Sequence, residues 1–189
     1  MNPILVVGAS AGGLQPLIYL IKAMPIPCAA SIFVVMHFGD LPSLLPSLLH
    51  RTGLPAGFPQ DGTLIEAGRI YVAPPGQHML LGPALVRLSQ GSKVHYTRPA
   101  IDPLFLSAAA AHGKRVIGVV LSGNGSDGAA GLKAIKEHGG TSLVQRPEDA
   151  ETPSMPHAAL AKDHPEPLSI QEIAQRVTSF CFRTRTLLS

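Results

Sequence analysis

The sequence contains no tryptophan, only three tyrosines and six phenylalanines among 189 residues, and few charged side chains. Charged residues make up 14%, compared with about 25% in a typical globular domain. The net charge is +3, and most cations are scattered singly along the chain. These shortages argue against a disordered tail or a coiled coil, and they disfavour nucleic acid, whose recognition needs clustered cations and stacking rings. We therefore expect no nucleic-acid partner.

Cysteines and long apolar runs are also scarce. Cys28 and Cys181 are the two cysteines, and they do not form a C-x-x-C motif, which favours a reducing compartment. No apolar stretch approaches the roughly 20 residues that a membrane-spanning helix needs. The first residues predict a strand rather than a signal peptide. We expect a cytoplasmic protein with no membrane insertion.

The chain is otherwise rich in apolar residues, which make up 46% of it. A chain of this length can bury a sizeable core, and we predict a single domain over residues 1–189. The 19 glycines and 18 prolines predict many tight turns between short elements. Such turns offer many places for a functional site.

Short apolar runs alternate with segments of helical periodicity along most of the chain. The runs are residues 4–7, 31–36, 116–122 and 141–145, and the helical segments are 14–21, 41–49, 102–111, 128–138 and 170–182. In the segment 41–49, Asp40 fits a helix cap and Pro42 fits the first turn. Fully apolar strands that alternate with helices predict a doubly wound α/β fold, with a mostly parallel sheet and helices on both faces.

The middle of the chain departs from this rhythm. Residues 68–76 and 78–88 have the pattern of short strands joined by glycine and proline turns, with a reversal at Gly82-Pro83. We predict an antiparallel hairpin excursion in this region.

Three chemically distinctive residues follow predicted strands. Ser10 comes after the first strand, His37 after the second, and Asp127 after the strand at 116–122. Because the carboxyl ends of parallel strands meet at one rim of a sheet, we expect the three side chains to converge there. Ser, His and Asp are the parts of a nucleophilic relay, in which the imidazole removes the hydroxyl proton and the carboxylate orients the imidazole.

Each of these residues also has a structural explanation. Ser10 lies in a glycine-rich turn before a helix, and Asp127 lies before another helix, so both can be helix caps. His37 can be an incidental histidine, and His78 is a second candidate base, although it lies in the predicted hairpin region. The backbone around Asn124 can form an anion-binding nest, which makes its main-chain N–H a candidate oxyanion contact.

Two other classes of site fit the sequence poorly. The glycines of residues 8–13 allow a phosphate or nucleotide site, but their spacing departs from G-x-G-x-x-G. His37 also stands where dinucleotide-binding folds place an acidic residue. The histidines lack metal-ligand spacing such as H-E-x-x-H, so we expect no metal.

Taken together, the motifs resemble the C-terminal catalytic domain of the chemotaxis protein-glutamate methylesterases, the CheB family. The resemblance rests on five segments in order, and a further match at Ser154-Met155-Pro156 extends it over nearly the whole chain. The five segments are Gly8-Ala-Ser-Ala-Gly-Gly, Met36-His37, Ala73-Pro-Pro-Gly-Gln-His-Met79, Arg98-Pro-Ala-Ile-Asp-Pro-Leu-Phe105 and Leu121-Ser-Gly-Asn-Gly-Ser-Asp-Gly128.

The resemblance implies an esterase that hydrolyses methyl esters of receptor glutamates and that can also deamidate receptor glutamine. It implies Ser10 as nucleophile, His37 as base and Asp127 as its partner, without a cofactor. Oxyanion contacts would come from backbone groups near the serine, at Ala11, and from Asn124. The expected partner is the coiled-coil cytoplasmic region of a methyl-accepting chemotaxis receptor.

Arg98 is a candidate for steering acidic side chains that neighbour the ester, and its structural explanation is a solvated cation before Pro99. The sequence also departs from the family pattern at three positions. Ala11, Met36 and Asn124 stand where members often have Thr, Gln and Met, which bears on efficiency and substrate choice more than on reaction type.

Chemotaxis members of the family usually carry a receiver domain before the esterase domain. This chain starts three residues before its first predicted strand, so we expect a stand-alone enzyme, a partner of a separate response regulator, or a domain cut from a longer protein. A non-catalytic binding module of a signalling complex is the main alternative function. A phosphate or nucleotide binder is the second alternative.

Overall fold

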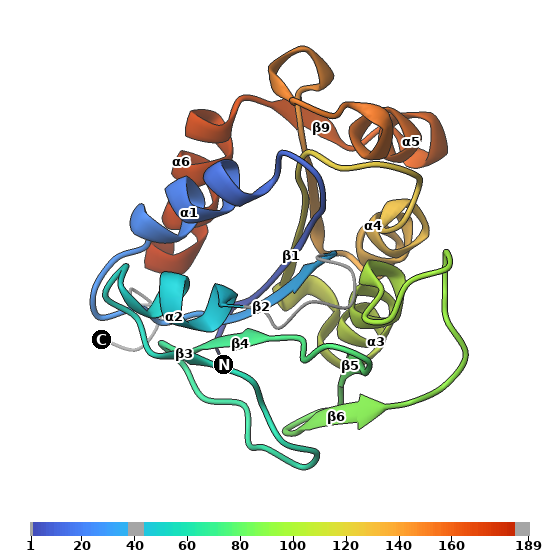
Figure 1. The fold of residues 1–189 in the computed structure, drawn as a ribbon. Helices are drawn as coiled ribbons and strands as arrows, with labels where there is room; N and C mark the ends of the chain where they lie inside the picture. The colour runs from blue at the N-terminus through green and yellow to red at the C-terminus, as the bar shows by residue number, and fades with distance from the viewer. Residues whose placement is uncertain (1, 38–43, 184–189) are drawn as a thin grey trace.

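The structure is a computed structural model that describes residues 2–37 and 44–183. Its centre is a parallel sheet with the strand order β3-β4-β2-β1-β7-β8-β9, and a two-stranded sheet, β5-β6, lies beside it (Figure 1). Every neighbouring pair in the large sheet is parallel, and the pair β5-β6 is antiparallel. The predicted fold class is confirmed.

The elements are short, as the glycine and proline content predicts. The strands are β1 Ile4–Ala9, β2 Ser31–Met36, β3 Ala56–Gly57, β4 Ile70–Val72, β5 His78–Leu81, β6 Val86–Ser89, β7 Val116–Val120, β8 Thr141–Gln145 and β9 Glu166–Leu168. The helices are α1 Leu14–Lys22, α2 Leu45–His50, α3 Ile101–His112, α4 Ala129–Glu137, α5 Ser154–Asp163 and α6 Ile170–Arg183, with short 3-10 turns η1 Gly113–Arg115 and η2 Pro147–Asp149. None of these described helices has both the length and the apolar character needed to cross a bilayer.

The large sheet separates two apolar cores. Along β1, Leu5 and Val7 point into one core, whereas Ile4 and Val6 point into the other, as the alternation of side chains along a strand requires. Helices α1, α2 and α6 cover the first face, and α3, α4 and α5 cover the second (Figure 1). Because both faces are covered, the inner strands are apolar throughout, which is the property that made them recognisable in the sequence.

Strand β1 lies at the point where the winding of the sheet reverses. From β1 the chain passes through α1 on one face to β2, and β7 pairs with the opposite edge of β1 before α4, on the other face, leads to β8. In open α/β sheets, ligands bind outside the carboxyl ends of the strands at such a reversal. The segments that follow β1, β2 and β7 therefore occupy the expected position of a site.

The middle of the chain corrects one prediction. The predicted antiparallel region included residues 68–76, but β4 within it pairs in parallel with β2. Its three residues Ile70, Tyr71 and Val72 are all buried, which is characteristic of an inner parallel strand. The antiparallel excursion is confined to β5 and β6, and it reverses at Gly82-Pro83, where Gly82 N–H donates to Leu85 O at 2.8 Å.

Other differences concern short or weakly patterned elements. Helix α2 begins at Leu45 rather than at residue 41, and the predicted cap Asp40 and Pro42 lie outside the described residues. The sequence reasoning did not identify β3, α5 or β9. Helix α5 buries only Met155, Pro156 and Ala159, so it lacks the apolar stripe that makes an amphipathic helix visible in a sequence.

Helices α3 and α4 approach each other closely at Gly131. A Cβ atom on Gly131 would overlap the Cβ of Phe105 and lie 3.1 Å from Asp102 Oδ1. The glycine therefore allows the two helices to touch through the backbone, and it leaves its own N–H free to donate to Asp102 Oδ1 at 2.7 Å.

We predict that Gly131→Ala lowers the free energy of unfolding by about 1–3 kcal/mol, because the added methyl group overpacks the α3–α4 contact. This outcome opposes the gain in helix propensity of about 1 kcal/mol expected for alanine at an exposed helical site. Urea denaturation measures the change. Gly57→Ala is the matched control, because a Cβ there meets nothing within 4 Å; equal stability of the two variants would contradict the prediction.

Candidate active site

Ser10 and His37 leave neighbouring strands at the same level. Ala9 pairs with Met36 in the last step of the β1–β2 ladder, and the His37 N–H donates to Ala9 O at 3.1 Å. Ala9 and Met36 belong to the core beneath α1 and α6. Because successive side chains alternate between faces, Ser10 and His37 are directed toward the other face, where α3 and α4 lie.

The turn that carries Ser10 is braced by the segment after β7. The Ser10 N–H donates to Ser122 O at 3.0 Å. The Ser122 hydroxyl donates to Ala11 O at 2.8 Å and accepts from the Thr152 N–H at 2.9 Å. Gly123 lies directly against the serine, since a Cβ on Gly123 would be 2.7 Å from Ser10 Cβ. These contacts fix the backbone of the Ser10 turn from two other segments.

Asp127 is held by the beginning of α3 and by His37. Its Oδ2 accepts from the Ile101 N–H at 2.7 Å and from His37 Nε2 at 3.0 Å, and its Oδ1 accepts from the Asp102 N–H at 2.8 Å. The side chain is 2% exposed, and that of His37 is 13% exposed. The alternative that Asp127 caps the following helix is wrong, because the residue before α4 is Gly128 and the carboxylate caps α3 instead.

The surroundings of Asp127 keep its carboxyl group ionised. Burial by itself raises its pKa, but the hydrogen bonds from His37, Ile101 and Asp102 outweigh this effect, and the net pKa lies below its ordinary value. The N-terminus of a helix also favours a negative charge. An ionised carboxylate accepts hydrogen bonds only, so His37 Nε2 must be the donor of the bond between them.

A second contact agrees with this tautomer of His37. Thr97 Oγ1 lies 3.4 Å from His37 Nε2 and donates its own proton to Val94 O at 3.0 Å. The threonine oxygen therefore offers a lone pair, not a proton, to Nε2. With the proton on Nε2, the unprotonated atom of a neutral His37 is Nδ1, which has no hydrogen-bond partner in the part of the chain that the structure describes.

A second histidine–aspartate pair lies next to the first. Asp102, in the first turn of α3, accepts from the Gly131 N–H of α4 at 2.7 Å and from His95 Nε2 at 2.9 Å. Asp127 before α4 thus caps α3, and Asp102 within α3 caps α4. Burial raises the pKa of Asp102, and the nearby charge of Asp127 raises it further, against the lowering effect of the bonds from Gly131 and His95.

The two candidate oxyanion contacts lie at exposed turns beside Ser10. Within the described ranges, the main-chain N–H groups of Ala11 and Asn124 donate no hydrogen bond. The loop of Asn124 is held by its neighbours, because the Gly125 N–H donates to Ser154 Oγ and Ser154 Oγ donates to Gly123 O, each at 3.2 Å. Both candidate donors are therefore available to a ligand.

Ser10 lies against Gly123, beside the two candidate oxyanion donors, but it is not hydrogen-bonded to His37. Its hydroxyl makes no hydrogen bond with any described residue. Catalytic hydrogen bonds are often long in ligand-free enzymes and shorten only when substrate is bound. The roles of Ser10, His37 and Asp127 in catalysis therefore stay predictions, while their arrangement at one rim is a property of the fold.

The other two candidates are engaged with the backbone. Arg98 Nη1 donates to Gln90 O and Gly91 O, both at 2.8 Å, so the guanidinium group ties down the connection between β6 and α3. His78 is buried, with Nε2 donating to Ser92 O at 3.0 Å and Nδ1 accepting from the Ala100 N–H at 3.2 Å. Neither nitrogen of His78 is left for a base, which makes His37 the stronger candidate.

One cluster of described residues has the composition of a metal site. His95, Asp102 and Asp127 each offer one ligand atom, and these atoms lie within 4.8 Å of one another. The carboxylate oxygens already accept hydrogen bonds from backbone N–H groups and from the two histidines. These bonds account for the cluster without a cation, and the expected absence of a metal stays a prediction.

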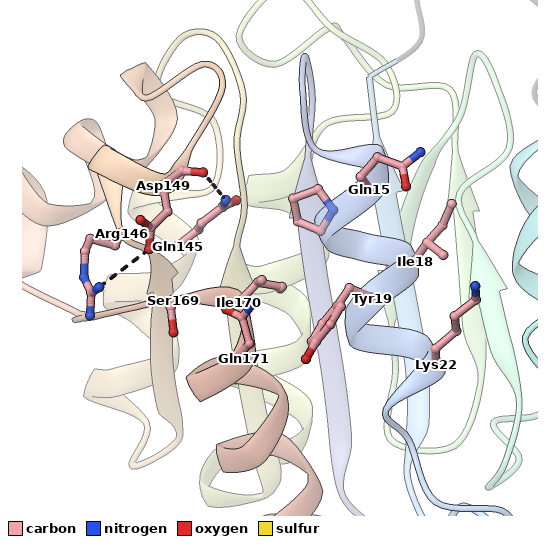
Figure 2. Close-up of a pocket in the computed structure, with 11 residues that line it drawn as sticks. Gln15, Ile18, Tyr19, Lys22, Gln145, Arg146, Asp149, Ser169, Ile170 and Gln171 are labelled. Carbon is pink, nitrogen blue, oxygen red and sulfur yellow. Dashed lines mark hydrogen bonds and ion pairs between the residues drawn. The ribbon is translucent and has the colours of Figure 1, made fainter.

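A groove of about 740 Å³ lies on the opposite face, between α1, the end of β8 and the start of α6 (Figure 2). Gln15 and Tyr19 line it from α1, and Gln145, Arg146 and Ile170 line it from the other side. None of the six predicted site residues lines this groove. It is therefore separate from the rim that carries Ser10 and His37.

Sequence reasoning missed the residues that support the site. Asp102 lies in one of the quoted motifs, yet its cap on α4 joins residues 29 positions apart. Ser122 braces Ala11 across 111 positions, and Thr97 reaches His37 across 60. No local sequence pattern predicts hydrogen bonds between residues that lie so far apart in the chain. The one available signal was that Asp102 is an acidic residue at the start of a predicted helix, where it can cap an N-terminus.

We predict that Asp127→Asn lowers the free energy of unfolding at pH 7 by about 2–3 kcal/mol, because an amide has one acceptor oxygen for three donors, and hydrogen bonds to charged groups are the stronger ones. The pKa of Asp127 is lowered in the folded protein, so its stabilising effect is complete above the unfolded value of about 3.9 and is lost as the pH falls through the folded value. Urea denaturation at pH 7 and pH 3 measures this.

The matched control for this measurement is Asp102→Asn. The pKa of Asp102 is raised, so its charge is disfavoured by folding at neutral pH, and its replacement by the neutral amide should cost less than that of Asp127. A larger loss for Asp102→Asn than for Asp127→Asn, or an Asp127→Asn effect that does not shrink at low pH, would show that the carboxylate is not stabilised as described.

The comparisons with known proteins agree with the fold and with the motifs. A model of the CheB methylesterase family matches residues 5–177. The crystal structure of the Thermotoga maritima CheB methylesterase catalytic domain superposes with a TM-score of 0.88 at 28% identity, covering 95% of this chain and 98% of that one.

Two curated relatives carry paired activity names. A protein-glutamate methylesterase/protein-glutamine glutaminase from Anaeromyxobacter dehalogenans is 38% identical over 159 residues, 83% of this chain and 47% of that protein. A relative from Leptospira interrogans, provisionally named for the same two activities, is 35% identical over 178 residues, 90% of this chain and 91% of its own length. The chain thus spans about half of the first relative and nearly all of the second. It belongs to the CheB methylesterase family.

Proposed function

We propose that this chain is a protein-glutamate methylesterase that hydrolyses glutamate methyl esters on chemotaxis-type receptors by a Ser-His-Asp mechanism, and that it also deamidates glutamine side chains. The observation that carries the proposal is the hydrogen bond from His37 Nε2 to the buried Asp127, at the end of the strand next to Ser10. The names of the relatives support both activities.

In the first step, Ser10 Oγ attacks the carbonyl carbon of the side-chain ester and His37 Nδ1 takes the hydroxyl proton. Asp127 stabilises the imidazolium that results, since its charge lies 3.0 Å from the opposite ring nitrogen. The tetrahedral intermediate then collapses: the bond to the methoxy oxygen breaks, His37 returns the proton to that oxygen, and methanol leaves an acyl-enzyme on Ser10.

The negative charge of the tetrahedral intermediate needs hydrogen-bond donors. The main-chain N–H groups of Ala11 and Asn124 are the proposed donors, because they are exposed beside Ser10 and donate to no described residue. Each such donor typically contributes about 2.7–4 kcal/mol to the stability of the transition state. Backbone groups can supply this stabilisation whatever side chains occupy positions 11 and 124.

In the second step, water attacks the acyl carbon while His37 Nδ1 takes one of its protons. The Ser10 oxygen leaves with that proton, and the glutamic acid side chain is released and gives its remaining proton to water, which leaves the carboxylate. Deamidation of glutamine follows the same path with ammonia as the leaving group. Neither proposed reaction needs a cofactor, because His37 moves the proton in each step that makes or breaks the bond to Ser10, and hydrogen bonds stabilise the charges that develop.

The proposed substrate partner is the coiled-coil cytoplasmic region of a methyl-accepting receptor, with the ester on an exposed helix and the reaction in the cytoplasm. A separate response regulator is the proposed source of control. Arg98 remains a candidate contact for acidic side chains near the ester: Nη1 is held by the backbone, but Nη2 has no partner among the described residues.

A non-catalytic binding module is the second candidate function. The observation in its favour is that the Ser10 hydroxyl makes no hydrogen bond to His37. A module of this kind would bind receptor through the same rim without releasing methanol. The two candidates therefore differ in turnover rather than in binding.

We predict that Ser10→Ala abolishes methanol release from methylated receptor and ammonia release from the glutamine form, with circular dichroism and melting temperature unchanged. The reason is that the proposed acyl-enzyme cannot form without the hydroxyl. Ser126→Ala is the matched control, because Ser126 is exposed on the same rim and its hydroxyl makes no hydrogen bond to the described residues. Turnover by Ser10→Ala at the wild-type rate would refute the mechanism, and receptor binding without turnover by the wild type would support the binding module.

A further inference from the structure

The connection from β6 to α3 contains a tight turn over residues 94–97, beside the proposed base. Val94 and Thr97 exchange backbone hydrogen bonds of 3.1 and 2.9 Å, and the two residues between them, His95 and Tyr96, have φ angles of 49° and 61°. This left-handed conformation is uncommon for residues other than glycine, although asparagine, aspartate and histidine adopt it more readily than the rest. Tyr96 is therefore the outlier of the turn, because a bulky aromatic residue rarely adopts a positive φ.

The turn is nevertheless held firmly. His95 Nε2 is 2.9 Å from the buried carboxylate of Asp102, and Thr97 Oγ1 donates to Val94 O at 3.0 Å. Arg98, the next residue, donates to two carbonyl oxygens at the beginning of the connection. Because Thr97 Oγ1 also lies 3.4 Å from His37 Nε2, the position of the turn is fixed relative to the proposed base.

Tyr96 stands at the tip of this turn and is 96% exposed. It makes no hydrogen bond, ion pair or ring contact with the described residues. A large aromatic side chain that does nothing for the fold and occupies a disfavoured backbone conformation is of functional interest, because such outliers cluster at binding and catalytic sites. Tyrosine is also suited to recognition, since its rigid ring offers a large contact area at a low entropic cost.

We propose that Tyr96 is a substrate-recognition residue, whose ring packs against the receptor helix one turn away from the ester, and that the His95–Asp102 pair positions it. This inference rests on the proposed function. On a helix, side chains three and four positions from the esterified glutamate lie about 5–6 Å from it on the same face. A residue next to Thr97, which contacts His37, is in position to meet the apolar parts of those side chains when the ester reaches Ser10.

The proposal predicts that the loss of the Tyr96 ring slows hydrolysis of a receptor substrate but not hydrolysis of a small ester. Tyr96→Ala should lower kcat/KM for the methylated receptor fragment about tenfold, which is the effect of losing about 1.4 kcal/mol of contact energy. Hydrolysis of a blocked single-residue glutamate methyl ester, which has no neighbouring helix, should stay within about twofold of the wild type. Methanol release measures both reactions.

Two further variants separate recognition from folding. Tyr96→Gly removes the ring and suits the left-handed backbone, so its melting temperature should be unchanged or raised by up to about 4 °C, with the same loss toward receptor as Tyr96→Ala. Tyr19→Ala removes another exposed tyrosine, 45% exposed on α1, and should leave both substrates unaffected. Equal losses on receptor and small ester would overturn the proposal, because they would place the effect on His37 instead.

A binding measurement keeps this inference separable from the proposed function. In the Ser10→Ala background, calorimetry with the methylated receptor fragment should give a dissociation constant about tenfold weaker when Tyr96→Ala is added. Absent methanol release by the wild type, together with this loss of affinity, would refute the proposed function and retain the role of Tyr96. Full kcat/KM and unchanged affinity in Tyr96→Ala, or no receptor binding at all, would refute the role of Tyr96.

Discussion

The site depends on one carboxylate at one helix terminus. Asp127 lies after β7, receives the first two N–H groups of α3 and receives the Nε2 proton of His37 from the end of β2. Three segments therefore meet at a single buried charge. Without the donors of α3 that charge would be costly to bury, and without the charge the imidazole ring would have no fixed orientation. The positions of α3, Asp127 and His37 at this rim follow from these two requirements: the buried charge needs hydrogen-bond donors, and the imidazole needs a fixed acceptor.

The two helices beside this charge depend on each other as well. Asp127 precedes α4 but caps α3, and Asp102 lies in the first turn of α3 but caps α4 through the N–H of Gly131. The close approach at Gly131 is what brings the second cap within reach. On this face of the sheet, the contacts that pack α3 against α4 also hold the two buried carboxylates. A substitution that alters the packing therefore alters the hydrogen bonds of the site as well.

Much of the fold was predictable from the sequence because burial on both faces makes β1, β2, β7 and β8 continuously apolar. Strand β4 was wrongly placed in the antiparallel region, since three apolar residues between glycine and proline turns fit a parallel or an antiparallel pairing. The candidate triad was visible because Ser10, His37 and Asp127 each follow a strand. Its supports were not, because the donors to Asp127 come from residues 25 and 26 positions earlier in the chain.

The wide separation of these partners along the chain has a consequence for biosynthesis. His37 and its carboxylate partner are 90 residues apart, and β7, the strand that precedes the carboxylate, begins only at Val116, so the ribosome makes it well after the histidine. A nascent chain therefore possesses the serine and the histidine long before the group that orients the imidazole exists. The contact between His37 and Asp127 can form only late, after β7 has been made and has docked against β1.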